Sequence, residues 1–339
     1  MNLEDIAKKA HVSRSTVSRV INNDPNVNQE TRQRVLQVIE QEGYEPNSAA
    51  RTLVTKHSRI IGVAIPQTIN VFFGDNSYFP MLLQGIASVL NKQDYAMLLW
   101  MAESHEVKVR DSFAKRVARH RQPDGLIITS VIQQDPLFDY LMRHNRRFVM
   151  VETPAKDAEQ VSYVTVDNIA AAMTAVQHLI SLGRRRIVHL SGQIMIQDAA
   201  DRLEGYRRAL EQGGLPIDDT LIYVGNFSIE HGYESMKTML VHKPDAVFCA
   251  GDQIAVGAMR AIQEAGLKIP DDIAVVGFDD LDVATQVNPS LTTVRHHIQT
   301  VGSTAAQLLI DQIEGRLEHP CQLVLSTELI VRESTVRQA

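Results

Sequence analysis

Apolar residues near the start of the chain recur at the three- and four-residue spacing of helices, and they do so three times. The first two predicted helices are defined by Leu3, Ile6, Ala7 and Ala10 and by Val17, Val20 and Ile21. Ser13 is placed to cap the second helix, and residues 22–26 have the composition of a loop. A third helix is predicted over about 29–42, with Gly43 as its stop and with Val35, Leu36, Val38 and Ile39 facing inward.

Two helices joined by a tight turn form the helix-turn-helix arrangement, whose second helix enters the DNA major groove. On the second predicted helix Arg14, Ser15 and Arg19 face outward. Arginine grips guanine O6 and N7 in a bidentate manner, and the hydroxyls of Ser13, Thr16 and Ser18 suit phosphate contacts. A small three-helix unit without a DNA role is the alternative, but the spacing of the apolar positions favours DNA binding.

After residue 58 the pattern changes to continuous apolar strands that alternate with helices. The first run predicts strands at 60–65, 95–100, 125–129 and 148–151 and helices at 78–92, 106–119 and 136–144. The second run predicts strands at 187–191, 221–224, 246–250 and 273–276 and helices at 198–212, 229–240, 253–265 and 298–314. Strands that are apolar throughout belong to parallel sheets covered on both faces. So long a repeat predicts two doubly wound lobes, with ligands bound outside the carboxyl ends of the strands.

Composition agrees with a folded chain of more than one domain, because 44% of the 339 residues are hydrophobic and 22% are charged. The net charge of −6 argues against a nucleic-acid partner only when it is taken for the whole chain. Residues 1–58 hold 8 basic and 7 acidic residues, and the remainder is net −7. The stretch from Ile6 to Asn23 holds four basic residues and no acid. A faintly positive head is therefore joined to an acidic body.

Several function classes are disfavoured by what the sequence lacks. Cys249 and Cys321 are the two cysteines, too few for a disulfide scaffold, and no apolar run or leader pattern indicates a membrane span or secretion. The sequence has no G-x-G-x-x-G, Walker, G-x-S-x-G or H-E-x-x-H motif, so no catalytic residue and no cofactor is predicted. His296 and His297 are adjacent and point apart, which makes a poor metal site. We expect a cytoplasmic protein that is not an enzyme and has no membrane partner.

Residues 3–55 closely resemble the N-terminal signature of the lactose/galactose repressor (LacI/GalR) family of transcription regulators. The matching motifs are Val12-Ser13, Thr16-Val17-Ser18-Arg19-Val20, Glu30-Thr31-Arg32, and Gly43-Tyr44 with Pro46-Asn47. The body matches the family at Arg202-Leu203-Glu204-Gly205-Tyr206, Ala250-Gly251-Asp252-Gln253-Ile254-Ala255, Val275-Val276-Gly277-Phe278-Asp279-Asp280 and Pro289-Ser290-Leu291-Thr292-Thr293-Val294. The resemblance extends over nearly the whole chain.

The resemblance implies which residues of the head contact operator DNA. Contacts at the operator are implied for Ser13, Arg14, Ser15, Thr16, Ser18 and Arg19, with Arg14 and Ser15 choosing the base sequence. Contacts with the DNA backbone are implied for Asn22, Asn26, Thr31, Tyr44 and Asn47. Residues 48–55 resemble a hinge that becomes helical only on the operator, with Ala50 and Leu53 at the DNA and Leu53 wedged into a minor-groove step. An exposed linker leucine is the alternative for Leu53.

The resemblance also implies the fold class. It is an N-terminal all-α helix-turn-helix domain followed by a two-lobed α/β body that resembles periplasmic sugar-binding proteins. We expect a DNA-binding domain over 1–47, a hinge over 48–58 and an effector-binding and dimerisation domain over 59–339. The expected first lobe comprises about 59–166 and 294–318, and the expected second lobe comprises about 167–293 and 319–333. No leucine-heptad tail follows the last predicted strand, so a homodimer is expected rather than a tetramer.

By the same resemblance, a small-molecule effector binds in the cleft between the lobes. Arg202 and Asp279 match the family's effector-binding arginine and acid, and facing each other they would bond vicinal sugar hydroxyls. A surface salt bridge and a turn-forming aspartate are the alternatives. Asp198, Gly251 and Asp252 complete this part of the predicted site. Gly251 stands where the family often has asparagine, and Asp252 is either a ligand contact or the N-cap of the next helix.

A long loop after the first body strand adds candidate sugar contacts. The candidates are Phe72, Phe73, Asp75, Asn76, Tyr78 and Phe79. Aromatic rings stack on the apolar face of a pyranose while carboxylate and amide groups bond its hydroxyls. Trp100, at the end of the second strand, is a further candidate, and core packing is the alternative for each of these aromatic residues.

The sequence therefore favours a DNA-binding transcriptional regulator over two other function classes. Repression is the commoner activity in the family, and the expected partners are a near-palindromic operator and a sugar effector. A purine or another metabolite is the second candidate for the effector. A sugar-binding transport protein shares the body but has no helix-turn-helix head, and an enzyme requires a nucleophile or cofactor motif that the chain lacks.

Overall fold

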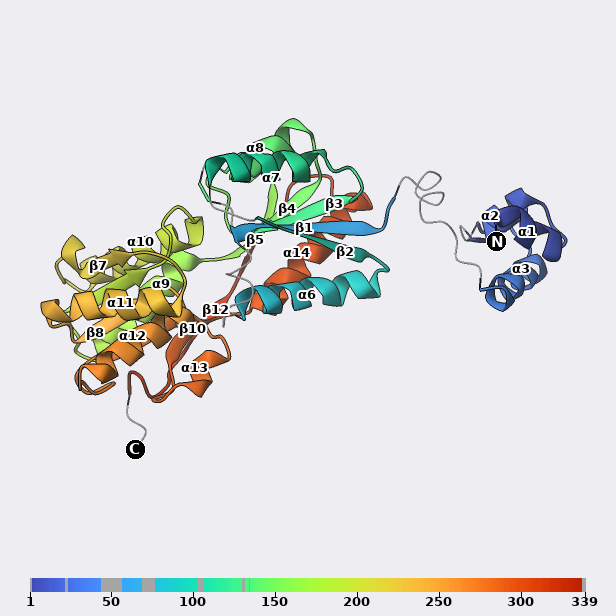
Figure 1. Cartoon of the computed structure of the whole chain (residues 1–339). Helices are drawn as coiled ribbons and strands as arrows, with labels where there is room; N and C mark the ends of the chain where they lie inside the picture. The colour runs from blue at the N-terminus through green and yellow to red at the C-terminus, as the bar shows by residue number, and fades with distance from the viewer. Residues whose placement is uncertain are drawn as a thin grey trace. The chain divides into compact units, whose positions relative to one another are not determined.

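The computed structural model describes residues 2–21, 24–43, 57–68, 77–102, 106–129, 132–133 and 135–336. The chain forms two compact units, Met1–Ser58 and Arg59–Ala339 (Figure 1). Within the described residues no helix is both long and apolar enough to span a membrane.

The first unit is a three-helix domain, as the apolar spacing predicts. α1 (Leu3–Lys9), α2 (Arg14–Ile21) and α3 (Gln29–Gln41) enclose a core of Ile6, Ala7, Ala10, Val17, Val20 and Val35. The Ser13 hydroxyl accepts a hydrogen bond from the Thr16 amide at 3.1 Å, so the predicted cap of α2 is confirmed. Gly43 follows α3 with a φ of +57°, a left-handed conformation that glycine adopts without strain.

One predicted inward position of α3 is wrong, because the Leu36 side chain is 47% exposed. The inward stripe of the helix consists of Val35, Val38 and Ile39. These three residues follow the i, i+3, i+4 spacing of one helix face. Leu36 is one residue beyond Val35 and is therefore rotated by about 100° away from that face.

The second unit contains two six-stranded sheets, one in each lobe. The first sheet has the order β11-β5-β4-β3-β1-β2, and its strands are all parallel. Its strands are β1 (Ile60–Thr68), β2 (Ala96–Ala102), β3 (Gly125–Thr129), β4 (Phe148–Val151), β5 (Ser162–Val166) and β11 (Gln322–Leu325). α6 (Tyr78–Lys92) and α14 (Ile298–Ile313) cover one face, and α7 (Val107–Arg119) and α8 (Pro136–Arg143) cover the other (Figure 1).

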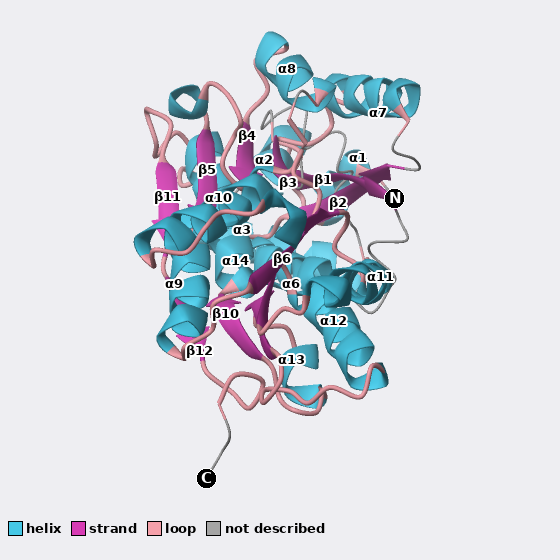
Figure 2. Ribbon diagram, turned by 90° about the vertical axis from the view of Figure 1, so that its left-hand side faces the viewer, coloured by secondary structure: helices cyan, strands magenta, loops and turns pink. Residues whose placement is uncertain are grey.

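The second sheet has the order β12-β10-β9-β8-β6-β7, with β12 antiparallel to β10 and the other pairs parallel. Its strands are β6 (Ile187–Ser191), β7 (Ile222–Val224), β8 (Ala246–Cys249), β9 (Ala274–Asp279), β10 (Thr292–His296) and β12 (Thr327–Ile330). α9 (Asn168–Ser181) and α10 (Gln197–Gln212) pack on one face, and α11 (Ile229–Met239) and α12 (Asp252–Glu264) pack on the other. The short α13 (Val283–Gln286) follows β9 (Figure 2).

The chain passes between the two sheets three times within residues 135–336. It passes after β5 into α9, after β10 into α14, and between β11 and β12. β11 ends at Leu325 and β12 begins at Thr327, so a single residue joins strands of different sheets. These short connections bring the two lobes together along the edge where the strands of both sheets end.

The strand pairing differs from the expected lobe boundaries at two places. β10 pairs with β9 in the second sheet, although the expected first lobe begins again at 294. β11 pairs with β5 in the first sheet, although 319–333 is expected in the second lobe. The last segment of the chain adds one short edge strand to each sheet, and four-residue strands have too few positions to show a clear period. α14 packs on the first sheet, in agreement with the expected return of the chain.

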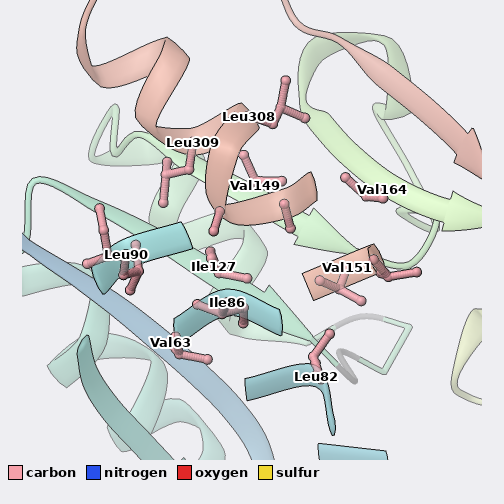
Figure 3. Close-up of a cluster of buried hydrophobic side chains, with 14 of the residues drawn as sticks. Val63, Leu82, Ile86, Leu90, Ile127, Val149, Val151, Val164, Leu308 and Leu309 are labelled. Atoms are coloured by element: carbon pink, nitrogen blue, oxygen red, sulfur yellow. The ribbon is translucent and has the colours of Figure 1, made fainter. Parts of the chain in front are cut away.

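A dense apolar core fixes α6 and α14 on the first sheet of the second unit. Figure 3 shows Leu82, Ile86 and Leu90 of α6 and Leu308 and Leu309 of α14 packed against Val63, Ile127, Val149, Val151 and Val164 of the first sheet. Gly85 of α6 lies against the Gln299 carbonyl of α14, and a side chain at Gly85 would collide with it. This close helix pair holds α6 in place, and the first residue of α6 is Tyr78, one of the predicted effector contacts.

Candidate functional site

The exposed face of α2 has the arrangement expected for reading DNA. Val17 and Val20 are buried and attach the helix to the domain core, while Arg14, Ser15 and Arg19 are exposed. Arg14 lies 3.7 Å from Glu4 and Arg19 lies 3.9 Å from Asp24, and both arginine side chains are about two-thirds exposed. Exposed pairs of this kind contribute little energy, so both guanidinium groups are available to another anion.

Three hydroxyl groups gather at the start of α2. The Ser13 hydroxyl lies 2.7 Å from that of Ser15 and 2.8 Å from that of Thr16. Such a cluster at a helix N-terminus suits a phosphate group, because the helix amides there also point outward. Ser18 is half-buried on the next turn.

The predicted backbone contacts divide into described and masked residues. Asn26 is exposed, and its amide and side chain both donate to Asp24, with the backbone bond lowering the pKa of that carboxyl. Thr31 is half-buried in the first turn of α3. The predicted contacts Asn22, Tyr44, Asn47, Ala50 and Leu53 lie outside the residues that the structure describes.

In the second unit Arg202 is the centre of a buried polar cluster. It lies on α10 with its side chain 4% exposed. Its Nε donates to the Asn168 side chain at 2.9 Å and one terminal nitrogen donates to the Ala250 carbonyl at 2.6 Å. The guanidinium also stacks 3.7 Å from the centre of the Phe278 ring. The arginine is therefore held rigidly by groups from three different elements, and the surface salt bridge considered for it is wrong.

Two of the predicted effector carboxylates meet Arg202 at longer distances. Asp279 Oδ1 lies 3.5 Å from one terminal nitrogen of Arg202, and Asp198 Oδ2 lies 4.0 Å from the other. Both aspartates are buried, and each keeps one oxygen without a hydrogen-bond partner among the described residues. The same holds for both ring nitrogens of His296, whose Nδ1 lies 3.7 Å from Asp279. Buried polar atoms without partners are rare in folded proteins, and they mark a place where a ligand or water supplies the partner.

The charges of this cluster also act on Tyr78, the first residue of α6 in the first lobe. The Tyr78 ring lies 6.1 Å from that of His296. Burial raises the pKa of Tyr78 well above its usual value, and the negative charges of Glu152, Asp198 and Asp279 raise it further. Burial likewise raises the pKa of Asp198, against the opposing effect of Arg202. Tyr78 of the first lobe therefore lies close to the aspartates of the second lobe.

Glu152 is a buried acid of this site that the sequence analysis did not identify. It follows β4, accepts a hydrogen bond from the Thr129 hydroxyl at 3.2 Å, and has a φ of +100°. Asp279 ends β9 with a φ of +104°. β4 and β9 are both third in their sheets, counted from β11 and β12, so the two acids occupy equivalent positions in the two lobes. Non-glycine residues with such angles are strained, and strain of this kind concentrates at binding sites.

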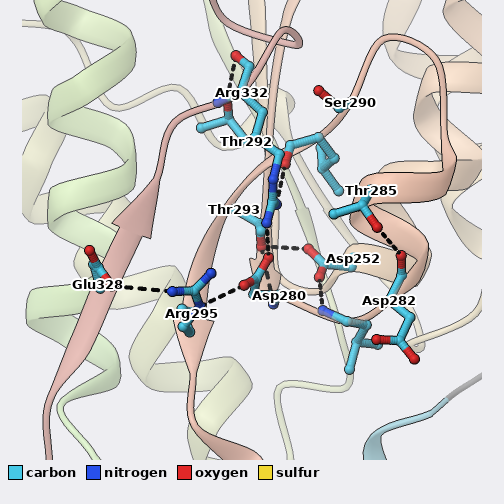
Figure 4. Close-up of polar contacts among 12 residues, drawn as sticks. Asp252, Asp280, Asp282, Thr285, Ser290, Thr292, Thr293, Arg295, Glu328 and Arg332 are labelled. Carbon is cyan, nitrogen blue, oxygen red and sulfur yellow. Dashed lines mark hydrogen bonds and ion pairs between the residues drawn. The ribbon is translucent and has the colours of Figure 1, made fainter.

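Asp252 has a structural role, and it is not the N-cap of α12 that was considered for it. Its carboxylate accepts hydrogen bonds from the Leu281 amide at 2.7 Å and the Thr293 hydroxyl at 2.6 Å, as Figure 4 shows. Gly251 is the N-cap of α12, and Asp252 is fully buried. Burial and the neighbouring Asp279 raise the pKa of Asp252 well above its usual value. The residue joins α12 to β10 and to the turn after β9.

The neighbouring Asp280 fixes the turn that presents Asp279. Its carboxylate accepts hydrogen bonds from Arg295 at 2.7 Å and from Arg332 at 2.6 Å (Figure 4). Arg332 also donates to the Leu291 carbonyl. Two charge-assisted bonds from different segments hold the left-handed conformations of Asp279 and Asp280 in place.

Two of the predicted aromatic contacts lie in the core instead. Phe79 is buried among the apolar residues between the first sheet and α6, because it lies on the inward face of that helix. Trp100 fills the space beside Gly62 and its ring lies 5.5 Å from that of His120, at the end of α7. Trp100 therefore packs on the α7 side of the sheet and not in the cleft. Phe72, Phe73, Asp75 and Asn76 lie outside the described residues.

Gly251 borders the site through a residue that the sequence analysis missed. A Cβ atom added at Gly251 would lie 3.2 Å from the Phe227 ring and 3.6 Å from Asp279 Oδ2. The ring of Phe227 therefore occupies the space beside the glycine, where an asparagine side chain would need room. This pairing of a glycine with a nearby aromatic residue gives the second-lobe wall an apolar surface next to its carboxylates.

The loops before α8 and α10 form a second contact between the lobes. Ile132 and Ile196 form an isolated antiparallel bridge, and the Gln133 amide donates to the Met195 carbonyl at 2.6 Å. The side chains of Gln133 and Gln197 are joined by a hydrogen bond of 3.2 Å. Gln197 begins α10, which carries Asp198 and Arg202, so this contact connects the first lobe directly to the helix of the polar cluster.

The described residues contain no group of three or more His, Cys, Asp or Glu side chains arranged to hold a metal ion. Cys249 is fully buried, and burial raises the pKa of its thiol well above the usual value. The chemistry of the site is therefore hydrogen bonding by one arginine, one tyrosine, one histidine and several carboxylates.

Comparison with known proteins identifies both units. Residues 2–47 match the lacI family of bacterial regulatory proteins, and residues 176–335 match the periplasmic binding protein-like domain. The transcriptional regulator CelR of Thermobifida fusca is 36% identical over 335 residues, which is 98% of this chain and 97% of that protein. Catabolite control protein A of Priestia megaterium is 31% identical over 338 residues, 99% of either chain.

Solved structures of relatives show the same fold over the full length. The CelR–cellobiose complex has a TM-score of 0.78 at 33% identity, covering 98% of this chain and 99% of the other. The lac repressor dimer bound to operator and an anti-inducer has a TM-score of 0.86 at 26% identity, covering 99% of both chains. These full-length relatives and the two matched domains show that the chain belongs to the LacI family of helix-turn-helix transcriptional regulators.

Proposed function

We propose that this protein is a transcriptional repressor that binds a near-palindromic operator as a homodimer, with an operator affinity set by a sugar bound between its two lobes. The exposed arginines of α2 support the DNA-reading part, and the lac repressor dimer on its operator supports the two-fold arrangement. Each protomer then supplies one α2 to one half-site, with Arg14 and Ser15 reading bases and Ser13 and Thr16 binding phosphate.

The observation that carries the sugar proposal is the surplus of acceptors in the buried cluster. Among the described residues, Asp198 and Asp279 each keep an oxygen without a partner. Together with Tyr78, Glu152, Arg202 and His296, these two aspartates form what we call the effector cluster. Among the described residues, Arg202 lies beside the carboxylates of both Asp198 and Asp279, so the site disfavours a ligand that carries its own negative charge. A neutral ligand rich in hydroxyl donors, which is the chemistry of a sugar, satisfies these acceptors.

The relative CelR has been solved with cellobiose, and its similarity extends over 98% of this chain. We therefore take a neutral glucose-containing disaccharide as the first ligand class to test. Tyr78 and Phe227 then supply ring surfaces for the sugar, one from each lobe. Phe72, Phe73, Asp75 and Asn76 stay predictions for the same site.

The proposal assigns a task to each segment of the chain. Residues 1–47 read DNA, residues 48–58 form a hinge whose Ala50 and Leu53 contact the minor groove, and residues 59–339 bind the effector and form the dimer. The protein acts as a switch and carries out no reaction. As a bacterial regulator of operator DNA it works in the cytoplasm, where that DNA is.

Titration of the full-length protein with ligands and with DNA tests the proposal. The operator is obtained by selecting bound duplexes from a random pool, and cellobiose, glucose, hypoxanthine and guanine are then titrated by calorimetry. We expect saturable binding of cellobiose and a change in operator affinity when cellobiose is present. The Arg202→Gln variant should lose sugar binding and keep operator binding, because Arg202 is in the effector cluster and not in the head.

The Arg19→Ala variant provides the opposite arm, since it removes an exposed arginine of α2 and leaves the second unit unchanged. It should bind cellobiose as the wild type does and lose specific operator binding. Recovery of no specific duplex by the wild-type protein would contradict the DNA-binding part. Binding of a purine and none of the sugars would contradict the sugar part alone.

A further inference from the structure

The body of the protein is not evenly acidic. Residues 107–147, which contain α7, β3 and α8, hold 9 lysine and arginine residues and 4 acidic residues. This segment is net +5 in a chain that is net −6. None of these basic residues belongs to the helix-turn-helix unit or to the effector cluster, so neither of the functions assigned above explains their concentration.

The acidic residues of this segment already have other partners. Asp111 binds Lys115 and Tyr140, Asp139 binds Lys156, and Asp124 accepts the Arg59 amide. Asp135 forms a buried ion pair with Arg110. The local excess of positive charge is therefore not cancelled by carboxylates of its own segment.

Five arginines of the segment are exposed and form no ion pair with a carboxylate among the described residues. These five, which we call the basic edge, are Arg116, Arg119, Arg121, Arg143 and Arg147. Elsewhere in the body, exposed Arg208 and Arg260 each pair with a glutamate one turn away. The basic edge thus lacks the carboxylate partners that Arg208 and Arg260 have.

Contacts between α7 and α8 bring the basic edge together. Arg146 donates to the carbonyls of His120 at 3.0 Å and Pro123 at 3.1 Å, which ties the end of α7 to the segment after α8. Burial and the nearby charge of Arg121 lower the pKa of Arg146. The Leu126 amide donates to the Arg147 carbonyl, so Arg147 lies where β3 and β4 begin. The C-terminal ends of α7 and α8 lie next to each other in both views of the fold (Figure 1; Figure 2).

The same edge of the first sheet receives the chain from the head. The Arg59 amide donates to Asp124, and the Asp124 amide donates to the Ile60 carbonyl at 2.9 Å. Pro123 and Asp124 lie directly between Arg121 and the first residues of β3. Gly43 and His57 are the last and first described residues on either side of the connection, which at about 3.3–3.6 Å per residue spans at most about 50 Å. DNA held by the head therefore stays within covalent reach of the basic edge.

We propose that the basic edge binds the phosphate backbone of DNA that flanks the operator half-site. This proposal rests on the operator binding proposed above and adds a second contact surface to it. Arginine forks match phosphate geometry in bidentate fashion, and exposed arginines without carboxylate partners repel one another until an anion neutralises them. The contact is independent of sequence, so it raises operator affinity without changing which operator is chosen.

The test compares duplexes of two lengths and two variants with the same loss of charge. The short duplex contains the selected operator alone, about 20 base pairs, and the long duplex adds about one helical turn of flanking DNA on each side. The triple variant Arg119→Gln, Arg121→Gln, Arg147→Gln removes three arginines of the basic edge. The control triple variant Arg208→Gln, Lys237→Gln, Arg260→Gln removes three exposed charges from the second lobe.

We expect the wild-type protein and the control variant to bind the long duplex more tightly and with a steeper salt dependence than the short one. The basic-edge variant should lose most of this difference. Each lost phosphate contact lowers the slope of log affinity against log salt by about 0.9, so three contacts from each of the two protomers lower it by about 5.4. If all six contacts form, a fourfold rise in salt should then weaken the wild type on the order of 1,000-fold more than the basic-edge variant, and about 40-fold more if the contacts of one protomer form.

Equal salt slopes for the wild type and the basic-edge variant on the long duplex would overturn the proposal. So would an equal loss in the control variant, because it would show that only total charge matters. Binding of polyglutamate through the basic edge, with no effect of flanking DNA, would assign the surface to an acidic protein and also overturn it. Failure of the wild type to bind any specific duplex would instead count against the proposed function. Unchanged cellobiose binding checks that each variant is folded.

Discussion

Burial removes water from the carboxylates around Arg202, and hydrogen bonds from neighbouring residues replace that water for only some of them. Asp252 and Asp280 each accept two hydrogen bonds from different segments, whereas Asp198 and Asp279 keep free acceptor atoms within the described structure. The first pair therefore stabilises the turn after β9, and the second pair keeps the acceptor atoms that the proposed sugar would satisfy. Two acids adjacent in sequence, Asp279 and Asp280, thus have opposite roles.

His189 is a fully buried histidine, and its titration should make the stability of the protein depend on pH. It is fully buried in β6, stacked between Tyr206 and Phe248 at 5.1 and 5.0 Å, and burial lowers its pKa to about 4. The unfolded chain then binds more protons than the folded chain between about pH 4 and 6.5, so stability is complete above pH 6.5 and falls as the pH drops below it. We expect the free energy of unfolding to fall by about 2 kcal/mol from this residue between pH 7.5 and pH 5.

Urea unfolding of the wild type, His189→Gln and His144→Gln at these two pH values measures the effect. His144 is exposed and serves as the matched control. The His189→Gln variant should show a smaller fall in stability with pH than the other two proteins, whatever its stability at pH 7.5. An equal fall in all three proteins would show that other groups produce the pH dependence.

Secondary structure elements with long apolar runs could be predicted from the sequence, whereas the short strands at the sheet edges could not. The predicted strands at 125–129 and 148–151 agree with β3 and β4, because every residue of these strands is buried. β11 alternates between exposed and half-buried positions, and β12 has three half-buried positions and one exposed position. Four residues in each strand are too short a signal to read. α9 was not predicted, although its buried residues follow the i, i+3, i+4 spacing of a single helix face; they are Asn168, Ala171, Ala172, Ala175, Val176 and Leu179.

The effector site was predictable only where a motif pointed to it. Arg202 and Asp279 follow from family motifs, and the structure brings them to 3.5 Å. Glu152 has no motif, but its place after an apolar strand gave a signal that the structure makes clear through its equivalence to Asp279. The sequence could not distinguish Phe79 and Trp100 from residues that face the effector, because it does not say to which face of a helix or strand a long side chain turns.

We predict that an engineered disulfide at the antiparallel bridge between the loops before α8 and α10 will hold the two lobes together. Residues paired across antiparallel strands have Cβ atoms about 4.5–5.5 Å apart, close to the spacing that a disulfide requires. Oxidation of the double variant Ile132→Cys, Ile196→Cys with cellobiose present should slow cellobiose release at least about tenfold, because the cleft must open for exchange. Reduction should restore the wild-type rate, as measured by displacement of labelled sugar.

The two single-cysteine variants control for nonspecific effects of the substitutions. The native thiols are less accessible to oxidation than the new ones, because Cys249 is buried and Cys321 is half-buried. Complete disulfide formation with unchanged release would show that sugar leaves without separation of these two loops.

For the whole molecule, the arrangement of charge explains how an acidic chain binds DNA. The head is net +1 and residues 107–147 are net +5, so positive charge lies at both ends of the connection between the two units. The acidic residues concentrate in the rest of the body, where three carboxylates form the effector cluster. Repulsion from the acidic regions opposes nonspecific binding of the body to DNA, which leaves the two basic regions to orient the protein on its operator.

Since the same protein binds sugar and operator, the two affinities are linked by thermodynamics. If cellobiose changes the operator affinity by a given factor, the operator must change the cellobiose affinity by the same factor. We expect a factor between about 5 and 150, which corresponds to about 1–3 kcal/mol of coupling. Calorimetric titration of cellobiose with and without saturating operator measures one side, and operator titration with and without saturating cellobiose measures the other. In Arg19→Ala, which should not bind the operator specifically, the duplex should leave the cellobiose affinity unchanged; a shift there would mean that DNA acts on the body directly and not through the head.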